Sequence, residues 1–163
     1  MRLQDPGCLA ALFGLGRRRE TPNRYPYRAR PYFFTDAEAS FYQFLKQMVG
    51  ENGVVFPHVA LRDLVSVRGV EQTHYYRYFH QIDKRQIDFL IADARTLKAR
   101  IAIELEDLSQ QGEQHPRRDE FVERVLEAAG IPFARVSVQP TYDAKELTEA
   151  FRLAIQKNAQ PTN

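Results

Sequence analysis

Four segments of the chain have the apolar pattern and the length of β-strands. Residues 86–92 and 100–106 carry apolar side chains at every second position, and the short link between them predicts an antiparallel pair. These side chains are Ile87, Phe89 and Ile91 in the first segment, and Ile101, Ile103 and Leu105 in the second. The apolar runs 54–61 and 133–138 predict two further strands, and Pro57 favours an edge or bulge position for the first of them.

Three other segments have apolar residues at helical spacing. The first begins with Thr35 and Glu38, whose spacing is that of a capping box. The second covers about residues 117–129 and is followed by glycine and proline, which end helices. The last begins with Asp143 and Glu146, again at capping-box spacing.

The order of these elements is helix, three strands, helix, strand, helix, which predicts an α/β fold with a mixed four-stranded sheet flanked by helices. A length of 163 residues suits one domain, which we assign to residues 35–157. Residues 1–34 are rich in Arg, Pro and Tyr and predict an extended arm, because proline at this density blocks a regular helix. Residues 158–163 predict a disordered or frayed tail.

Composition narrows the class of protein. The chain is 44% hydrophobic and 27% charged, which excludes a disordered, collagen-like or coiled-coil chain. The single cysteine, Cys8, excludes internal disulfides and thiolate zinc sites and predicts a reducing, cytoplasmic location. No apolar run approaches the roughly 20 residues of a membrane span. Residues 8–15 are followed, not preceded, by arginines, so they do not fit a secretory signal, although a weak membrane-surface segment stays open.

The charge is unevenly distributed. Residues 1–34 carry seven arginines against two acids, whereas the rest of the chain carries 16 basic and 19 acidic residues. A basic arm that includes Arg17, Arg18 and Arg19 can bind nucleic-acid phosphates by counterion release. The alternative is a solvated N-terminus with no partner.

Residues 62–83 are less regular in pattern and contain aromatic residues interleaved with basic ones from Tyr75 to His80. Such a stretch can stack on bases, or it can be the buried side of a short helix, and we favour core packing. The four histidines have no metal-ligand spacing and predict surface or packing positions. They are His58, His74, His80 and His115.

The candidate chemistry lies in three carboxylates within the central strands, Asp88, Glu104 and Glu106. A hairpin centred near Thr96 sets Asp88 opposite Glu104, where two like charges destabilise each other unless something offsets them. Mg²⁺ or Mn²⁺, which prefer oxygen ligands, would do so. The alternative is a polar strand face in solvent. Glu38 is explained by its capping box, but its position on the helix also allows it to reach the sheet.

An acid in one strand followed by an acid-x-residue pair in the next resembles the PD-(D/E)XK nuclease superfamily. The chain is more closely similar to the bacterial domain-of-unknown-function 2726 family within it, over roughly residues 25–138. The stretches that carry the resemblance are Thr35-Asp36-Ala37-Glu38, residues 59–64, Arg85-Gln86-Ile87-Asp88-Phe89, Ile103-Glu104-Leu105-Glu106-Asp107, and Arg118-Asp119 with Ala129-Gly130-Ile131-Pro132.

The resemblance implies a restriction-endonuclease-like αβββαβ core and a nuclease-like domain that cleaves phosphodiester bonds with Mg²⁺ or Mn²⁺. It implies nucleic acid as the partner, with DNA favoured over RNA. Asp88 and Glu104 are then metal ligands, Glu106 is a third ligand or a base, and Glu38 is a peripheral catalytic candidate.

Two positions depart from the pattern. Glu106 stands where the superfamily has lysine and where the closer family usually has aspartate, and Gln110 stands where that family has histidine after Ser109. A cation must therefore reach the phosphate from elsewhere. The candidates are Lys84, Lys98, Arg117 and Arg118. The alternatives are a catalytically impaired nucleic-acid-binding module of the same fold, or a protein-interaction domain whose acids are solvated.

Overall fold

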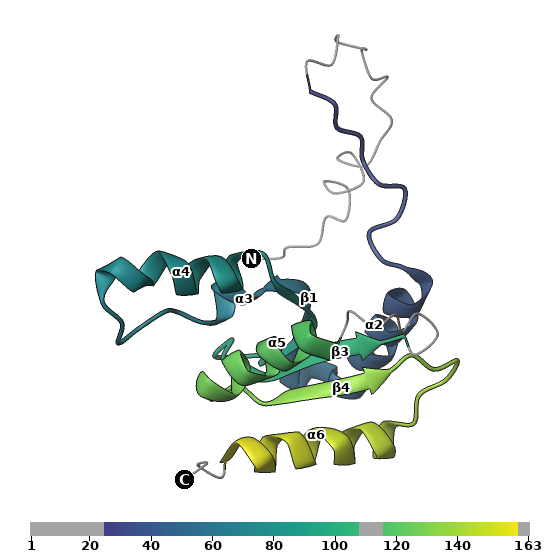
Figure 1. Ribbon diagram of the computed structural model, residues 1–163. Coiled ribbons are helices and arrows are strands. Elements are labelled where there is room, and N and C mark those ends of the chain that lie inside the picture. Colours follow the sequence, from purple (N-terminus) through teal and green to yellow (C-terminus); the bar gives the residue numbers. More distant parts are fainter. Residues whose placement is uncertain (1–24, 108–115, 160–163) are drawn as a thin grey trace, which may run out of the picture. The chain divides into compact units, whose positions relative to one another are not determined.

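The computed structural model describes residues 25–107 and 116–159, with side chains at 116–119 excepted (Figure 1). The chain divides into two compact units, Met1–Phe33 and Phe34–Asn163. In the described part of the first unit, Tyr25 and Tyr27 stack with ring centroids 6.4 Å apart, and both rings are exposed to solvent.

The second unit is an α/β fold built on one four-stranded sheet, as predicted. The strand order is β1-β2-β3-β4; the first three strands are antiparallel, and β3 and β4 are parallel, which makes the sheet mixed. The elements are α2 (Asp36–Val49), the 3₁₀ turn η1 (Gly50–Asn52), β1 (Gly53–Ala60), α3 (Leu61–Leu64), α4 (Gln72–Asp83), β2 (Gln86–Asp93), β3 (Ala99–Glu106), α5 (Pro116–Ala128), β4 (Phe133–Ser137) and α6 (Ala144–Ala159).

Helices cover both faces of the sheet (Figure 1). On one face, α2 and α6 pack on a buried cluster of Phe41, Leu45, Phe89, Ile91, Ile101, Ile103, Ala134, Val136, Leu147 and Phe151. On the other face, α3, α4 and α5 pack on Leu61, Ile82, Ile87, Leu90, Ala102, Val122 and Leu126. This double burial explains why the two central strands are apolar on both faces at their middle.

The capping box that opens α2 is confirmed. Thr35 Oγ1 accepts a hydrogen bond from the Glu38 backbone N–H, and the Glu38 carboxylate accepts one from the Thr35 backbone N–H. The predicted edge position of the strand that contains Pro57 is also confirmed, because β1 has a neighbour on one side only.

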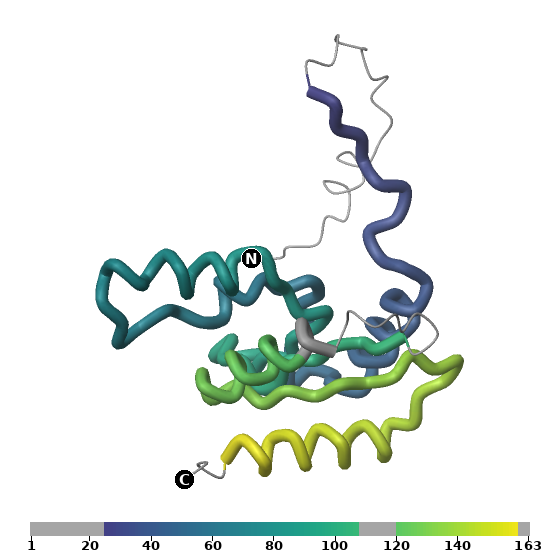
Figure 2. Tube along the Cα trace, viewed as in Figure 1, coloured from purple at the N-terminus to yellow at the C-terminus, as the bar shows by residue number. Residues whose placement is uncertain are grey.

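The expected element order had no helix between the first two strands, but α3 and α4 lie there, and Figure 2 shows the chain running out after α3 and returning through α4. The expected core packing of the tyrosines is also wrong. Tyr75, Tyr76 and Tyr78 are 38%, 66% and 46% exposed. The physical reason is that α4 reaches the core through two side chains of one face, Phe79 and Ile82.

The two ends of the chain are only partly described. Helix α6 runs to Ala159, so residues 158 and 159, which were expected to belong to the tail, are helical; residues 160–163 lie outside the described residues. Arg17, Arg18 and Arg19 also lie outside them. None of the helices that the structure describes combines the length and apolarity that crossing a bilayer needs.

Candidate functional site

The hairpin of β2 and β3 has the predicted register from Phe89 to Ile91, and the register shifts by one residue at Ala92, which pairs with Ala99. Phe89 lies opposite Ile103, and the pairing continues with Leu90 opposite Ala102. Continued by one residue in the other direction, this register sets the Asp88 backbone across from Glu104. Strand alternation places both residues on the α5 side of the sheet, where Leu90 and Ala102 are buried.

The Asp88 carboxylate is fixed by the neighbouring strand. Its Oδ2 accepts a hydrogen bond of 2.8 Å from the backbone N–H of Leu105, the residue that follows Glu104. Both acids are half-buried, and Glu104 Oε2 is shielded from solvent. Two carboxylates in adjacent strands therefore lie at partly desolvated positions, where an oxygen-preferring cation would be bound more strongly than on an open surface.

The turn that sets this register depends on Asp93. Its Oδ1 accepts hydrogen bonds from the backbone N–H groups of Arg95 and Thr96 and from the Thr96 hydroxyl, and its Oδ2 pairs with Arg100. The Arg100 hydrogen bond, supported by those from Thr96, holds the pKa of Asp93 well below its usual range. An ionised Asp93 thus stabilises the turn that joins β2 to β3.

Glu38 contacts the sheet at β1. Its Oε2 accepts hydrogen bonds from the Thr35 backbone N–H (2.8 Å) and hydroxyl (2.9 Å), and its Oε1 lies 3.1 Å from His58 Nε2. The ring of Phe34 lies edge-on to the His58 imidazole, with centroids 5.6 Å apart. Burial raises the pKa of Glu38, but the Thr35 hydrogen bonds and His58 outweigh it, so the net pKa is lowered.

His58 is the residue that sequence reasoning undervalued. Its φ of 51° is in the left-handed region, which is uncommon for a residue with a side chain and is a form of strain often found at functional sites. The strand pairs Pro57–Phe89 and Val59–Ile87 lie on either side of it, so the His58 backbone is opposite Asp88. The one signal in the sequence was Pro57, which favoured an edge or bulge position without giving a role to its neighbour.

Arg135 brings a positive charge to the strand beside Glu104. In the parallel pairing of β3 and β4, Arg135 lies directly opposite Glu104, and its Nε is 3.3 Å from Glu106 Oε1. Its guanidinium carbon lies 5.1 Å from the centre of the Phe133 ring. Sequence reasoning did not identify this residue, because the pairing of two strands separated by a helix cannot be counted along the chain.

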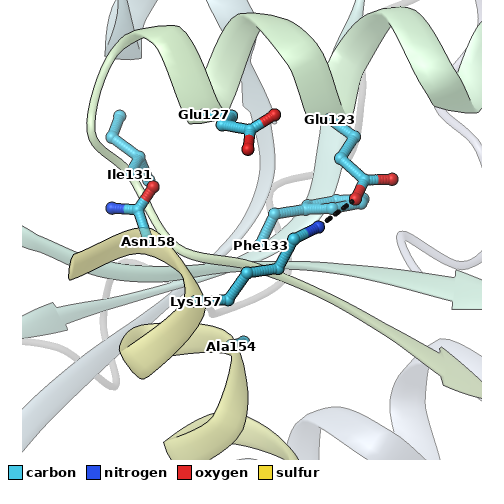
Figure 3. Close-up of a pocket in the computed structure, with 7 residues that line it drawn as sticks. All are labelled: Glu123, Glu127, Ile131, Phe133, Ala154, Lys157 and Asn158. Atoms are coloured by element: carbon cyan, nitrogen blue, oxygen red, sulfur yellow. Dashed lines mark hydrogen bonds and ion pairs between the residues drawn. The ribbon is translucent and has the colours of Figure 1, made fainter. Parts of the chain in front are cut away.

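Arg135 also belongs to an ion-pair chain that leads away from the strands. Its Nη1 is 2.9 Å from Glu123 Oε2 on α5, and Glu123 Oε1 is 3.2 Å from Lys157 Nζ on α6. Figure 3 shows this last pair at the rim of a small pocket between α5 and α6. Burial raises the pKa of Glu123, but Lys157 and Arg135 outweigh it and lower the pKa overall.

The Glu106 carboxylate forms an ion pair with Arg135. Among the residues that the structure describes, no three His, Cys, Asp or Glu side chains are grouped closely enough to hold a metal ion. The pair Asp88 and Glu104 still fits Mg²⁺, which is usually bound by one or two carboxylates and completes its shell with water and substrate phosphate. A site made of all three acids is not what the described geometry provides.

The other predicted residues lie apart from this pair. Lys84 is exposed at the end of α4, and Lys98 is exposed in the β2–β3 turn. Because five residues of strand separate Asp88 from that turn, Lys98 is about 17 Å away along the sheet. The remaining side chains lie outside the described part of the chain. They are Arg117, Arg118, Ser109, Gln110 and His115.

The comparison with protein families decides what the chain is related to. The model for a protein of unknown function, DUF2726, matches residues 30–155. The chain belongs to the DUF2726 family. The DUF2726 match spans all four strands and therefore includes Asp88, Glu104 and Arg135. No curated protein and no solved structure matches the chain.

Proposed function

We propose that this DUF2726 protein is a metal-dependent phosphodiester hydrolase of the PD-(D/E)XK type that acts on nucleic acid, with DNA favoured. The observation that carries the proposal is the placement of Asp88 across from Glu104, with the Asp88 carboxylate accepting a hydrogen bond from the Leu105 backbone N–H. The element order supports it, because without the short insertions η1, α3 and α4 it is αβββαβ followed by α6. The single cysteine favours a cytoplasmic location.

Asp88 and Glu104 would hold the metal. A bound Mg²⁺ or Mn²⁺ supplies an activated water and neutralises charge on the phosphate. The Leu105 N–H restricts rotation of the Asp88 carboxylate, so one ligand is oriented before any ion arrives. The bond from Glu38 to His58 secures edge strand β1 beside Asp88, so we assign Glu38 a positioning role.

Arg135 is our candidate for the cation that the superfamily places on a lysine. Glu106 occupies that lysine position, and it contacts the Arg135 guanidinium from the next strand. The charge therefore comes from β4 and is held in place by Glu106 and Glu123. A guanidinium beside the carboxylate pair can stabilise negative charge that develops on a phosphate.

The test is cleavage of end-labelled single- and double-stranded DNA under single-turnover conditions with Mg²⁺, with Mn²⁺ and with chelator. Asp88→Asn and Glu104→Gln preserve size and are each expected to lower the rate by at least about 100-fold, because loss of a ligand removes most of the metal's contribution. The matched control is Glu51→Gln, an exposed acid of η1. Equal rates for the wild type and both site variants would refute the proposal.

A second candidate is a nucleic-acid-binding module of the same fold that does not cleave. The observation that favours it is the pairing of Glu106 with Arg135, which removes an acid from the metal-binding set. In that case the affinity for nucleic acid falls steeply as the salt concentration rises. Binding persists in chelator and is unaffected by Asp88→Asn, and no DNA is cleaved.

A further inference from the structure

Helix α4 presents an aromatic and basic face that the core does not use. Tyr76 and His80 are four residues apart and Arg77 adjoins them, so these three lie along one side of the helix, and Lys84 is the C-cap residue directly after it. We call these four residues the α4 outer face. Each of them is exposed, and Tyr76 is exposed by 66%.

The rings of this face are arranged next to one another. The centroids of Tyr76 and His80 are 6.4 Å apart with their planes at 32°, and the Tyr75 ring meets Tyr76 edge-on at 5.6 Å. Tyr75 in turn stacks on Phe79, which packs against the core. Tyr76 is thus supported from the core side while its outer surface stays in solvent, as in a stacking platform.

The charge of α4 favours a negatively charged partner. The single acid within the helix is Asp83, and its Oδ1 is paired with Arg62 at 2.5 Å. Arg77 and Lys84 make no ion pair with any residue that the structure describes. Exposed cations beside an exposed aromatic ring are the combination that binds single strands, in which phosphates pair with cations and bases stack on rings.

We infer that the α4 outer face binds single-stranded nucleic acid, with Tyr76 stacking on a base and with Arg77 and Lys84 contacting phosphates. The inference rests on the proposed function and adds a substrate class to it. The stripe from Tyr76 to Lys84 is about 12 Å long. It ends directly before β2, four residues ahead of Asp88. A single-stranded nucleic acid bound to this face is therefore led to the start of β2, which carries the Asp88 carboxylate.

The test measures the affinity of the full chain for a labelled oligothymidine of about 12 nucleotides and for a duplex of equal length, in chelator, over a range of salt. Tyr76→Ala is expected to weaken single-strand binding by at least about fivefold, and Tyr76→Phe is expected to bind like the wild type. Arg77→Gln is expected to reduce the slope of log affinity against log salt by about 0.7.

Tyr78→Ala is the matched control, because this tyrosine is on the same helix, is 46% exposed and points away from the outer face. Equal weakening by Tyr78→Ala and Tyr76→Ala, or binding of the duplex as tightly as the single strand, would overturn the inference. Metal-dependent cleavage with unchanged binding by Tyr76→Ala would overturn the inference but not the proposed function. Single-strand binding through Tyr76 without cleavage would overturn the function and leave the inference standing.

Discussion

Arg135 shows how one side chain can connect three elements and the candidate site at once. It extends from β4, contacts Glu106 on β3 and Glu123 on α5, and lies over Phe133. Each contact is only partly shielded from solvent, so each is individually modest, but the guanidinium satisfies two carboxylates with one planar group. Lysine could not reproduce this geometry.

We therefore expect Arg135→Ala to destabilise the fold by about 1–2 kcal/mol, because it removes the guanidinium from the half-buried Glu106 and leaves Glu123 with Lys157 alone. Arg135→Ala is also expected to lower the cleavage rate, and Arg135→Lys, which keeps the positive charge but not the planar fork, is expected to recover part of the stability and part of the rate. Urea unfolding followed by circular dichroism gives the first quantity, and the DNA assay gives the second. An alanine variant that unfolds at the wild-type midpoint would contradict this role.

Glu123 makes the same network sensitive to acid. Its ordinary pKa is 4.5, and although burial raises it, Lys157 and Arg135 lower it in the folded chain. The unfolded chain therefore binds more protons than the folded chain at pH values between the folded and the unfolded pKa of Glu123. The stabilisation from Glu123 is complete above pH 5 and is lost as the pH falls through the folded pKa.

Glu123→Gln is thus expected to be less stable than the wild type at pH 7 and to lose less stability between pH 7 and pH 3.5. The measurement is the urea midpoint of both proteins at the two pH values. Glu127→Gln, an exposed neighbour on α5, is the control. Parallel acid profiles for the wild type and Glu123→Gln would count against the assignment.

At the scale of elements, α2 and β1 are joined through one capping box. Glu38 caps the first turn of α2 and also bonds to His58, so the start of the helix and the strained residue of the edge strand share one carboxylate. A change in the cap should therefore be felt in β1 as well as in α2. This coupling is the reason that we give Glu38 a positioning role.

Thr35→Ala removes the hydroxyl that accepts from the Glu38 backbone N–H and donates to the Glu38 carboxylate, and it is expected to cost about 1 kcal/mol of stability. Thr35→Ser keeps the hydroxyl and is expected to cost no more than a few tenths of a kcal/mol of stability. Hydrogen exchange of the amides of residues 54–56 and 58–60 reports the effect on β1. Faster exchange confined to α2 would show that the cap and the strand are independent.

At the scale of the molecule, the sequence was enough for the features that depend on local pattern. The alternation of residues 86–92 and 100–106 and the length of the link gave the hairpin register, because both are counted along the chain. The capping box of α2 followed from Thr35 and Glu38 alone. The mixed sheet followed from the order of the elements.

The features that depend on contacts distant in sequence could not be obtained in this way. Arg135 reaches Glu106 only because β3 and β4 pair in parallel across a helix, and His58 reaches Glu38 only because its backbone leaves the usual strand conformation. The tyrosines of α4 were expected in the core because aromatic residues usually pack there. Whether a helix face is covered depends on its neighbours, and the α4 outer face has none in the described part of the chain.

The central claim is that Asp88 and Glu104 together hold one divalent cation. Calorimetric titration of Mn²⁺ into the full chain tests it most directly, with Asp88→Asn, Glu104→Gln and the control Glu51→Gln measured alongside. We predict one ion per wild-type chain, the same for the control, and at least about tenfold weaker binding for each site variant. Unchanged Mn²⁺ binding in either site variant would contradict the claim.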